Sequence, residues 1–333
     1  MKTNSAIRKI IEYGIMAPSG HNTQPWKFKI DQNEIQIYPD FTKSLPVVDA
    51  DHHAMYISLG CAVENIVLAA LNDGYFPEVR IVKKHGDAEF ICIALQVNSE
   101  SHKDYLYRYI KERQVTRNEY KDTEVSPEDL ELLIDSTRFP GVQVRSFITP
   151  EEINQLEPLI IEGSIRQFRN KQFVEELVSW IRFSKTEIEK KKDGIWHASM
   201  GFPGTGKFLG NLIMKKFVSA ESEAKRWKKL IRASAGFLLF IAEENDVTHW
   251  VNLGRAFQRF GLTACKLKIS HAHVNMPCEE FEVREKMTKL LGIDIGYPLL
   301  LIRFGYSNKM PYSYRRPMEE VLSDASPLVE QSI

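Results

Sequence analysis

Apolar and polar residues alternate in two periodic patterns along this 333-residue chain. Apolar residues recur at helical spacing and predict helices at residues 5–16, 54–71, 249–268 and 279–291, with an interrupted helical stretch over 150–192. Period-two alternation and short apolar runs predict strands at 26–30, 34–38, 78–82, 90–97, 142–148, 234–242 and 298–304. Helix is also predicted from Tyr105 to Glu112. The chain therefore mixes both element types from end to end.

The two long helices resemble each other, because 54–71 and 249–268 are both strongly apolar and both carry Gly and Ala. This similarity suggests an internal duplication, with a second unit that begins near His102. Residues 193–217 lack clear periodicity and are rich in Gly, aromatics and Met. Long irregular segments in compact domains are often lids, so a lid is predicted there.

Composition narrows the range of functions. The 44 basic and 44 acidic side chains cancel, which argues against a nucleic-acid binder. Neither a signal peptide nor an 18-residue apolar run is recognised, so we expect a cytoplasmic protein without a membrane span. No Cys-x-x-Cys pair occurs, and free thiols in a reducing compartment are predicted at Cys61, Cys92, Cys265 and Cys278.

The densest chemistry lies in residues 17–26, Ala-Pro-Ser-Gly-His-Asn-Thr-Gln-Pro-Trp, which we call the signature loop. Two prolines bracket it and prevent the preceding helix from continuing. Its amide, hydroxyl and imidazole groups beside an aromatic would suit a planar ligand that forms hydrogen bonds. A helix-ending turn followed by a strand is the alternative interpretation.

The signature loop resembles that of the nitroreductase superfamily of flavoenzymes, and it is most similar to the internally duplicated Acg-type branch. In this family the loop covers the isoalloxazine ring of FMN from the neighbouring subunit. The resemblance implies an α+β fold, with central antiparallel or mixed sheets flanked by helices, and it implies FMN as the cofactor. The residues of the loop expected to bind FMN are Pro18, Ser19, His21, Asn22, Gln24 and Trp26.

Residues 113–117, Arg-Gln-Val-Thr-Arg, resemble the phosphate-binding signature of the same family. Two guanidinium groups four residues apart would share one helical face, and guanidinium suits bidentate contact with phosphate. Val115 occupies the position of the usual serine, and Thr116 is the substitute hydroxyl. Binding is expected from Arg113, Gln114, Thr116 and Arg117. A solvated arginine pair on a helix is the alternative.

Two further segments complete the predicted cofactor site. In nitroreductases the loop after the second long helix places a backbone N–H near flavin N5, and by position this implies His273, Val274 and Asn275. Arg315 and Arg316 resemble the basic pair of the family that clamps the phosphate near the C-terminus. Each of these two arginines, taken singly, could also be part of a basic surface tail.

The resemblance as a whole implies a fused pseudo-dimer. Residues 1–101 form a first half that covers the flavin, and 102–333 form a second half that binds phosphate and carries a lid insertion at about 160–230. One FMN site per chain is expected, in a monomeric pseudo-dimer or a homodimer. The expected reaction transfers hydride from NAD(P)H through FMN to a nitroaromatic or quinone, with no catalytic side chain assigned. A flavin-storage protein with little turnover and a structural protein with a degenerate site are the alternatives.

Other patterns carry less weight. His52 and His53, or His271 and His273, could bind a metal, but no further ligand is evident at either place, and no metal is predicted. The run from Gly201 to Lys207 fits most of a P-loop, but Phe208 follows where Ser or Thr is required. Within the lid, flat apolar surface is expected from Trp196, Phe202 and Phe208.

Overall fold

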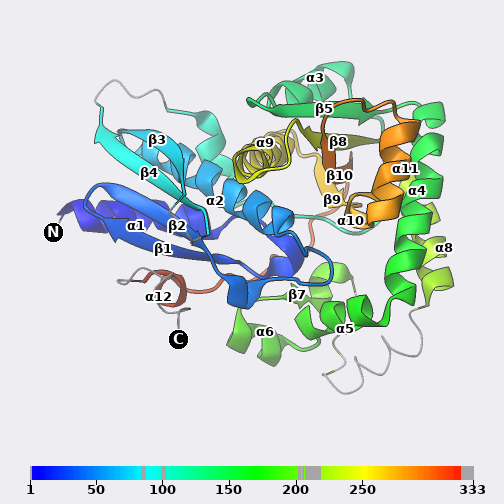
Figure 1. The fold of residues 1–333 in the computed structure, drawn as a ribbon, viewed down its shortest axis with the longest axis horizontal. Coiled ribbons are helices and arrows are strands. Elements are labelled where there is room, and N and C mark those ends of the chain that lie inside the picture. Colours follow the sequence, from blue (N-terminus) through cyan, green and yellow to red (C-terminus); the bar gives the residue numbers. More distant parts are fainter. Residues whose placement is uncertain are drawn as a thin grey trace.

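The computed structural model describes residues 2–83, 88–98, 103–201, 204, 206 and 219–323. Phe202, Lys207 and Phe208, which belong to the P-loop-like run and the predicted lid, lie outside the described residues. The described chain forms two four-stranded antiparallel sheets with helices between and around them (Figure 1). The predicted α+β class is thus confirmed.

The first sheet follows a helix, and a second, long and buried helix connects two of its strands. Its strands are ordered β1-β2-β4-β3, and each neighbouring pair is antiparallel. The elements of this half are α1 (Lys2–Ile15), β1 (Trp26–Asp31), β2 (Glu34–Pro39), α2 (His53–Asn72), β3 (Tyr75–Val82) and β4 (Phe90–Val97). A turn at Gln32 and Asn33 joins β1 to β2, as the alternating pattern predicts.

The second sheet repeats this arrangement. Its order is β5-β8-β10-β9, so in both sheets the strands follow the sequence first, second, fourth, third, with a long helix between the second and third. The elements are α3 (Pro127–Asp135), β5 (Val142–Phe147), β8 (Gly236–Ala242), α9 (Val247–Lys266), β9 (Ser270–His273) and β10 (Tyr297–Gly305). Between β9 and β10 lie α10 (Met276–Glu279) and α11 (Phe281–Leu290).

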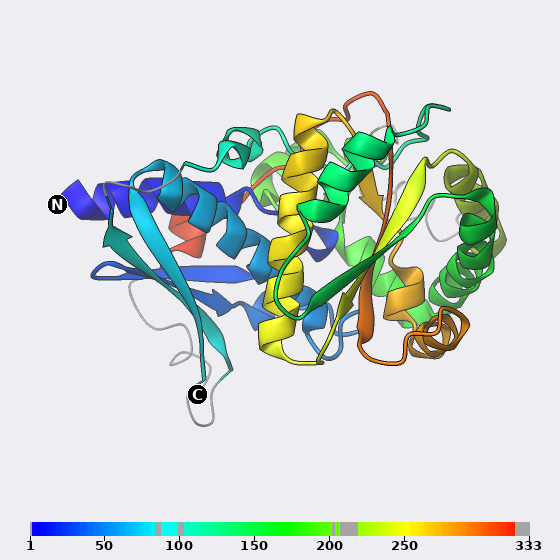
Figure 2. The same ribbon diagram turned by 90° about the horizontal axis from the view of Figure 1, so that it is seen from above.

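The long helices α2 and α9 pack against each other between the two sheets (Figures 1 and 2). A Cβ added to Gly60 would lie 2.2 Å from the carbonyl oxygen of Val251, and one added to Gly254 would lie 2.0 Å from that of Ile57. Each glycine therefore faces the carbonyl three residues before the other glycine. This reciprocal contact is the pattern that a two-fold axis produces in a dimer interface.

Helix α2 is also long and apolar enough to cross a membrane, by length and composition alone. However, 89% of its most apolar window is buried inside the protein. Its apolar character is accounted for by α9 and the first sheet, which pack around it. Helix α2 is therefore a core helix.

The connection between β5 and β8 contains the predicted insertion. Figure 1 shows it running beside the second sheet and then beneath both halves, toward β1. Its elements are α4 (Pro150–Arg169), α5 (Lys171–Trp180), β6 (Ile181–Arg182), α6 (Lys185–Lys191), β7 (Ile195–Trp196), a 3-10 helix (His197–Met200) and α8 (Ala220–Arg232). The interrupted helical stretch over 150–192 is confirmed, and α4 begins with a capping box between Thr149 and Glu152.

Several local predictions were wrong or incomplete. The helix expected from Tyr105 to Glu112 is a 3-10 helix that ends at Tyr109. Residues 113–117 are not helical, so the two arginines do not share a helical face. The backbone N–H of Thr116 instead donates to the carbonyl of His271 at 2.9 Å, which fastens this segment beside β9. The helices α3 and α8 and the short strand β9 were not predicted.

After β10 the chain returns to the first half. Residues 306–317 have no regular structure and lead to α12 (Met318–Val321). The N–H of Ser323 donates to the carbonyl of Phe28 at 2.8 Å, and Leu322 forms a bridge with the same residue of β1. This return brings the basic pair Arg315 and Arg316 beside the signature loop.

Candidate functional site

The signature loop holds an unusual backbone conformation between α1 and β1. Three residues that are not glycine have positive φ, namely His21 at 46°, Asn22 at 56° and Gln24 at 55°. Such left-handed conformations cost roughly 1–2 kcal/mol per residue. They persist where surrounding contacts fix them, and they gather at functional sites.

The Asn22 side chain supplies part of that fixation. Its Nδ2 donates to the carbonyls of Gly194 at 3.0 Å and Tyr314 at 3.2 Å, and its Oδ1 accepts from Nη1 of Arg315 at 3.0 Å. The N–H of Gly194 also donates to the Asn22 carbonyl at 3.0 Å. The side-chain amide thus joins the signature loop to the β5–β8 connection and to the C-terminal return.

The Gln24 side chain also fixes the signature loop. Its Nε2 donates to the carbonyl of Lys192 at 2.9 Å, and its Oε1 accepts from the backbone N–H of Arg316 at 2.7 Å. Because both amides bond to protein, Asn22 and Gln24 position the loop in this structure. They hold the shape into which a ligand would fit.

The remaining predicted residues of the loop differ in accessibility. Trp26 is 0% exposed and packs beside Phe28 in the core, so it offers no face to a ligand. Pro18 is buried, and the Oγ of Ser19 accepts from the N–H of Gln24 at 2.9 Å. These residues shape the loop, and the charge of Arg117 from the second half acts on His21.

His21 lies near basic groups from the second half. Burial and the charge of Arg117 lower the pKa of His21 to about 4. Burial, followed by the charges of Arg117, Arg113 and His21, lowers the pKa of His273 to about 3. The imidazoles of both halves are therefore neutral at neutral pH, and the charge of Arg117 acts on both of them. We call this group the Arg–His cluster: His21, Arg113, Arg117, His271, His273 and Arg315.

Arg113 and His271 lie side by side in this cluster. A Cβ added to Gly261 of α9 would touch both, at 3.2 Å from Cδ of Arg113 and 3.3 Å from Cε1 of His271. Burial and the charge of Arg113 lower the pKa of Arg315 to about 9. The charges of Arg113 and Arg315 therefore act on each other.

Buried nitrogens without a partner are concentrated in the Arg–His cluster. Among the described residues, none donates to or accepts from Nε and Nη1 of Arg113, Nε of Arg315, Nε2 of His271 or Nδ1 of His21. The Nε2 of Gln114 is also buried without a described partner, while its Oε1 accepts from the N–H of Met310 at 2.7 Å. Buried polar groups in proteins are normally paired, so this concentration indicates a place for an acceptor-rich ligand.

The arginines of the cluster also lack counter-charges. No described carboxylate lies within 4.0 Å of the guanidinium nitrogens of Arg113, Arg117 or Arg315. Burying a cation without a partner is costly, and burial lowers the pKa of Arg113 for this reason. An anion bound here would remove that cost.

Arg316 has a different environment from the other three predicted arginines. Its Nε lies 3.3 Å from Glu320, its Nη1 lies 3.8 Å from Asp40, and Nη1 also donates to the Gln24 carbonyl at 3.3 Å. This charge is already balanced. The structure therefore does not bring all four arginines to one unpaired site.

The structure adds Arg303, which the sequence interpretation missed. This side chain is 1% exposed, and its Nη2 donates to the carbonyls of Arg117 at 3.0 Å and Asn118 at 2.7 Å. Its guanidinium lies over the Tyr120 ring, 4.0 Å from the centroid, while Nε and Nη1 have no described partner. An arginine in the middle of the apolar strand pattern over 298–304 was the signal that could have revealed it.

The segment after α9 is used mainly for structure. The N–H of Val274 donates to the Leu301 carbonyl at 2.9 Å, so this amide is not available to a ligand. Asn275 accepts from the N–H of Leu301 at 2.9 Å and donates to Glu279 at 3.2 Å. Of the three residues predicted here, His273 is the one that couples to the arginines.

Among the described residues, one group has the composition of a metal site, namely Asp49, Asp51 and His53. Asp49 accepts from the N–H groups of Ala54 at 2.8 Å and Met55 at 2.9 Å, and His53 bonds to Asp51. Capping of α2 accounts for this geometry.

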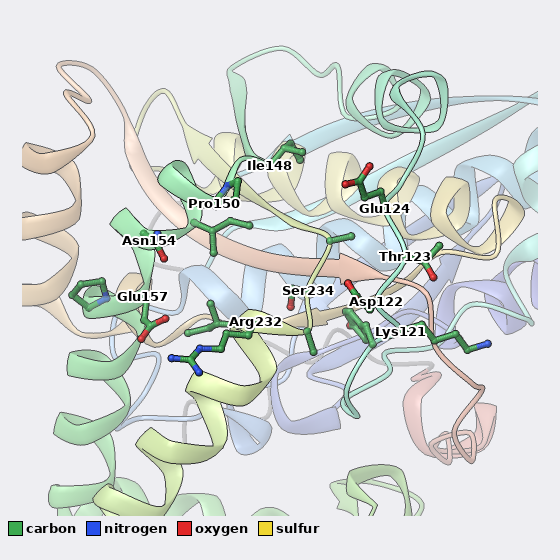
Figure 3. Close-up of a pocket in the computed structure, with 16 residues that line it drawn as sticks. Lys121, Asp122, Thr123, Glu124, Ile148, Pro150, Asn154, Glu157, Arg232 and Ser234 are labelled. Carbon is green, nitrogen blue, oxygen red and sulfur yellow. The ribbon is translucent and has the colours of Figure 1, made fainter.

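A large open cleft of about 780 Å³ lies elsewhere, between the start of α4 and the end of α8 (Figure 3). Lys121, Glu157 and Arg232 are on its rim, and Ile148 and Ile153 contribute apolar surface. It includes none of the residues that the sequence predicts for the cofactor, so the Arg–His cluster is the better candidate.

Comparison with known proteins finds similarity to nitroreductases. Residues 1–70, which include the signature loop, match the sequence model of a family described as "Putative TM nitroreductase". Two Mycobacterium tuberculosis proteins, from strains CDC 1551 and H37Rv, are each 21% identical over 98% of this chain and 93% of their own length. Both are named as putative NAD(P)H nitroreductases. The chain is therefore similar to proteins that are named as nitroreductases.

Solved structures similar to this nitroreductase-like protein include two flavoproteins. An FMN-dependent nitroreductase from Mycobacterium smegmatis in complex with NADPH is 13% identical, with a TM-score of 0.44, over 66% of this chain and 97% of its own. An iodotyrosine deiodinase bound to FMN and 3-iodo-L-tyrosine is 13% identical, with a TM-score of 0.42, over 64% and 95%. With scores below 0.5, these matches add no evidence for the fold beyond the strand order described above.

Proposed function

We propose that this protein is an FMN-dependent oxidoreductase that takes hydride from NAD(P)H and delivers it to a small acceptor such as a nitroaromatic or a quinone. The observation that carries the proposal is the Arg–His cluster, in which five buried nitrogens have no hydrogen-bond partner and three arginines have no counter-charge among the described residues. The names of the full-length relatives support the same activity.

The residues present fit the phosphate end of FMN. The free nitrogens of Arg113 and Arg315 would bond to phosphate oxygens, and charge-assisted bonds of this kind are the strong ones. The neighbouring Nε2 atoms of Gln114 and His271 would add neutral donors. Val115 provides no hydroxyl, and these donors are the available replacements.

The two histidines that face the arginines would contact the ligand without adding charge. Because burial and the arginines hold the pKa of His21 to about 4 and that of His273 to about 3, both imidazoles stay neutral at pH 7. When bound, FMN supplies the hydride chemistry, and the protein orients it and excludes water. No side-chain acid or base is assigned, because hydride transfer itself requires none.

We further propose that the chain is a fused pseudo-dimer of the internally duplicated type. The identical strand order of the two sheets and the reciprocal contact between Gly60 and Gly254 support this. The signature loop occurs once, in the first half, and the pair Arg113 and Arg117 occurs once, in the second half. One composite FMN site per chain follows from this arrangement, in a cytoplasmic protein.

A flavin-storage protein is the second candidate, and one observation favours it. The β5–β8 connection is bonded to the signature loop through Gly194 and Lys192, and Lys43 pairs with Asp193 at 2.8 Å. A segment held in this way would act as a lid that restricts access of nicotinamide to the flavin.

Purification followed by two measurements tests both candidates. The absorption spectrum and the flavin released on denaturation should show FMN at one per chain; absence of FMN, or two per chain, would contradict the composite site. Stopped-flow bleaching by NADH or NADPH then separates the candidates. Bleaching on the time scale of turnover supports the reductase, and bound FMN that is reduced by dithionite but not by either nucleotide supports storage.

A further inference from the structure

A second, smaller cavity of about 190 Å³ lies between the second sheet and the β5–β8 connection. Residues of β9 and β10 form one wall, and the β5–β8 connection forms the other. Its surface is mostly apolar, through Phe168, Leu177, Ile181, Ile195, Trp227 and Met276. His273 reaches it as well, so it adjoins the Arg–His cluster.

The charged groups of this cavity are unbalanced. Among the described residues, three guanidinium groups line it, from Arg117, Arg226 and Arg303, and Glu223 is the one lining carboxylate. Glu223 is already engaged by Nη1 of Arg226 at 3.0 Å. The cavity therefore has a formal excess of two positive charges.

Part of this excess charge, on Arg303, is incompletely paired. Its Nη2 is used by the carbonyls of Arg117 and Asn118, but its buried Nε and Nη1 have no described partner. Burial and then the charges of Arg226 and Arg303 lower the pKa of Arg117 to about 10, which shows that the three cations act on one another. An anionic group in the cavity would satisfy the free nitrogens and relieve this repulsion.

The size and surface of the cavity define the rest of the ligand. Ligand pockets for drug-sized molecules span roughly 300–1,000 Å³, so 190 Å³ suits a molecule with a single ring. A three-ring flavin with its ribityl phosphate is too large. Apolar walls with an arginine at one end match an aromatic ring that carries a carboxylate.

We propose that this cavity binds a small aromatic carboxylate as the acceptor of the reductase, with Arg303 and Arg226 holding the carboxylate. The identification as an acceptor rests on the proposed function, whereas binding of the carboxylate does not. For a nitrobenzoate the balanced step is nitro group + NAD(P)H + H⁺ → nitroso group + NAD(P)⁺ + H₂O. The carboxylate is unchanged and serves for recognition.

Calorimetry on the FMN-loaded protein tests the binding site directly. Benzoate should bind about 10- to 100-fold more tightly than benzamide, because the amide retains the ring but lacks the charge. Arg303→Met should remove most of this preference and leave benzamide binding unchanged. Equal affinities for the two ligands in the natural protein would overturn the proposal.

Arg226→Gln provides a second variant, because Arg303 supports the backbone at Arg117 and its replacement could prevent folding. The Arg226 side chain is 37% exposed, so a smaller loss of about 3- to 10-fold is expected for benzoate. Arg232→Gln on the same helix is the matched control, since Arg232 faces the open cleft and should leave benzoate affinity unchanged. A loss in the control equal to that of Arg226→Gln would contradict the assignment.

Competition separates the proposal from other occupants. Benzoate that is displaced from apoprotein by FMN would assign the cavity to the flavin, and benzoate displaced by NADPH but not NADH would assign it to a nucleotide phosphate. Either result overturns the proposal. Turnover should favour 4-nitrobenzoate over 4-nitrobenzamide in kcat/KM, by a ratio that Arg226→Gln reduces. Selective benzoate binding without any NAD(P)H turnover would refute the proposed function alone and leave the carboxylate site standing.

Discussion

Replacing Arg113 by Met should have two opposite effects, on ligand binding and on the stability of the apoprotein. The guanidinium is 5% exposed, its Nε and Nη1 have no described partner, and no described carboxylate neutralises it. In the apoprotein this buried cation is a cost, and Met fills similar space without charge. We therefore expect the free energy of unfolding of the apoprotein to be unchanged or to rise by about 1–3 kcal/mol.

For FMN the same substitution removes charge-assisted bonds to the phosphate. Hydrogen bonds to charged groups contribute about 1.5–3 kcal/mol each, so the loss of one corresponds to a roughly 10- to 100-fold higher Kd. Riboflavin has the same ring and ribityl chain without the phosphate, and its Kd should change by less than about twofold. Fluorescence titration of both flavins gives the two constants, and urea unfolding of the apoprotein gives the stability.

Arg182 is the matched control for a buried arginine with a structural role. Its Nη2 lies 2.7 Å from Asp193, and both side chains are buried. Removing one partner of such a pair costs about 3–5 kcal/mol, so Arg182→Met should destabilise the apoprotein strongly. If Arg113→Met destabilises it to the same degree, Arg113 is a structural residue. If FMN and riboflavin weaken equally, the phosphate assignment is wrong.

Three further predictions concern the halves, the signature loop and pH. Gly254→Ala should lower the free energy of unfolding by about 1–3 kcal/mol or more, since its Cβ would lie 2.0 Å from the Ile57 carbonyl oxygen. Ala is otherwise the better helix former. Unchanged stability would therefore disprove the close contact. Asn22→Ala should cost about 2–4 kcal/mol through lost bonds and left-handed strain, and Asn22→Gly, which avoids the strain, should cost less. In the folded protein the pKa values of His21 and His273 are about 4 and about 3, whereas in the unfolded chain both are about 6.5. As pH falls below about 6.5, the unfolded chain therefore binds protons before the folded protein does. Apoprotein stability should therefore be full above pH 6.5 and decline toward pH 4, and His21→Gln with His273→Gln should flatten that decline in pH-dependent urea unfolding.

Local pattern was sufficient for most of the framework. The apolar runs over 54–71 and 249–268 became α2 and α9 within two residues at each end, and the alternation around Gln32 and Asn33 became the β1–β2 hairpin. These elements follow from periodicity, because each buries one face of a regular structure. The signature loop was recognised because its residue types are unusual and contiguous.

The tertiary structure decided which of these residues have free polar groups. Asn22 bonds to the Tyr314 carbonyl, 292 residues away, and Gln24 receives the N–H of Arg316, so both amides are used by protein. Arg316 has Glu320 and Asp40 beside it, whereas Arg113 has no carboxylate partner among the described residues. Sequence spacing cannot distinguish these cases, because pairing depends on groups that only the folded chain brings together.

Burial explains the remaining differences in the same way. Arg303 looked like one polar residue in an apolar strand, and only the fold shows that its guanidinium lies over Tyr120 with two nitrogens unpaired. Residues 113–117 were expected to be helical, but the N–H of Thr116 bonds to β9 instead. The sequence alone determined most of the elements and the motif. The packing of the two halves determined which charges are left unbalanced, because the cost of an unpaired buried group arises only when water is excluded from it.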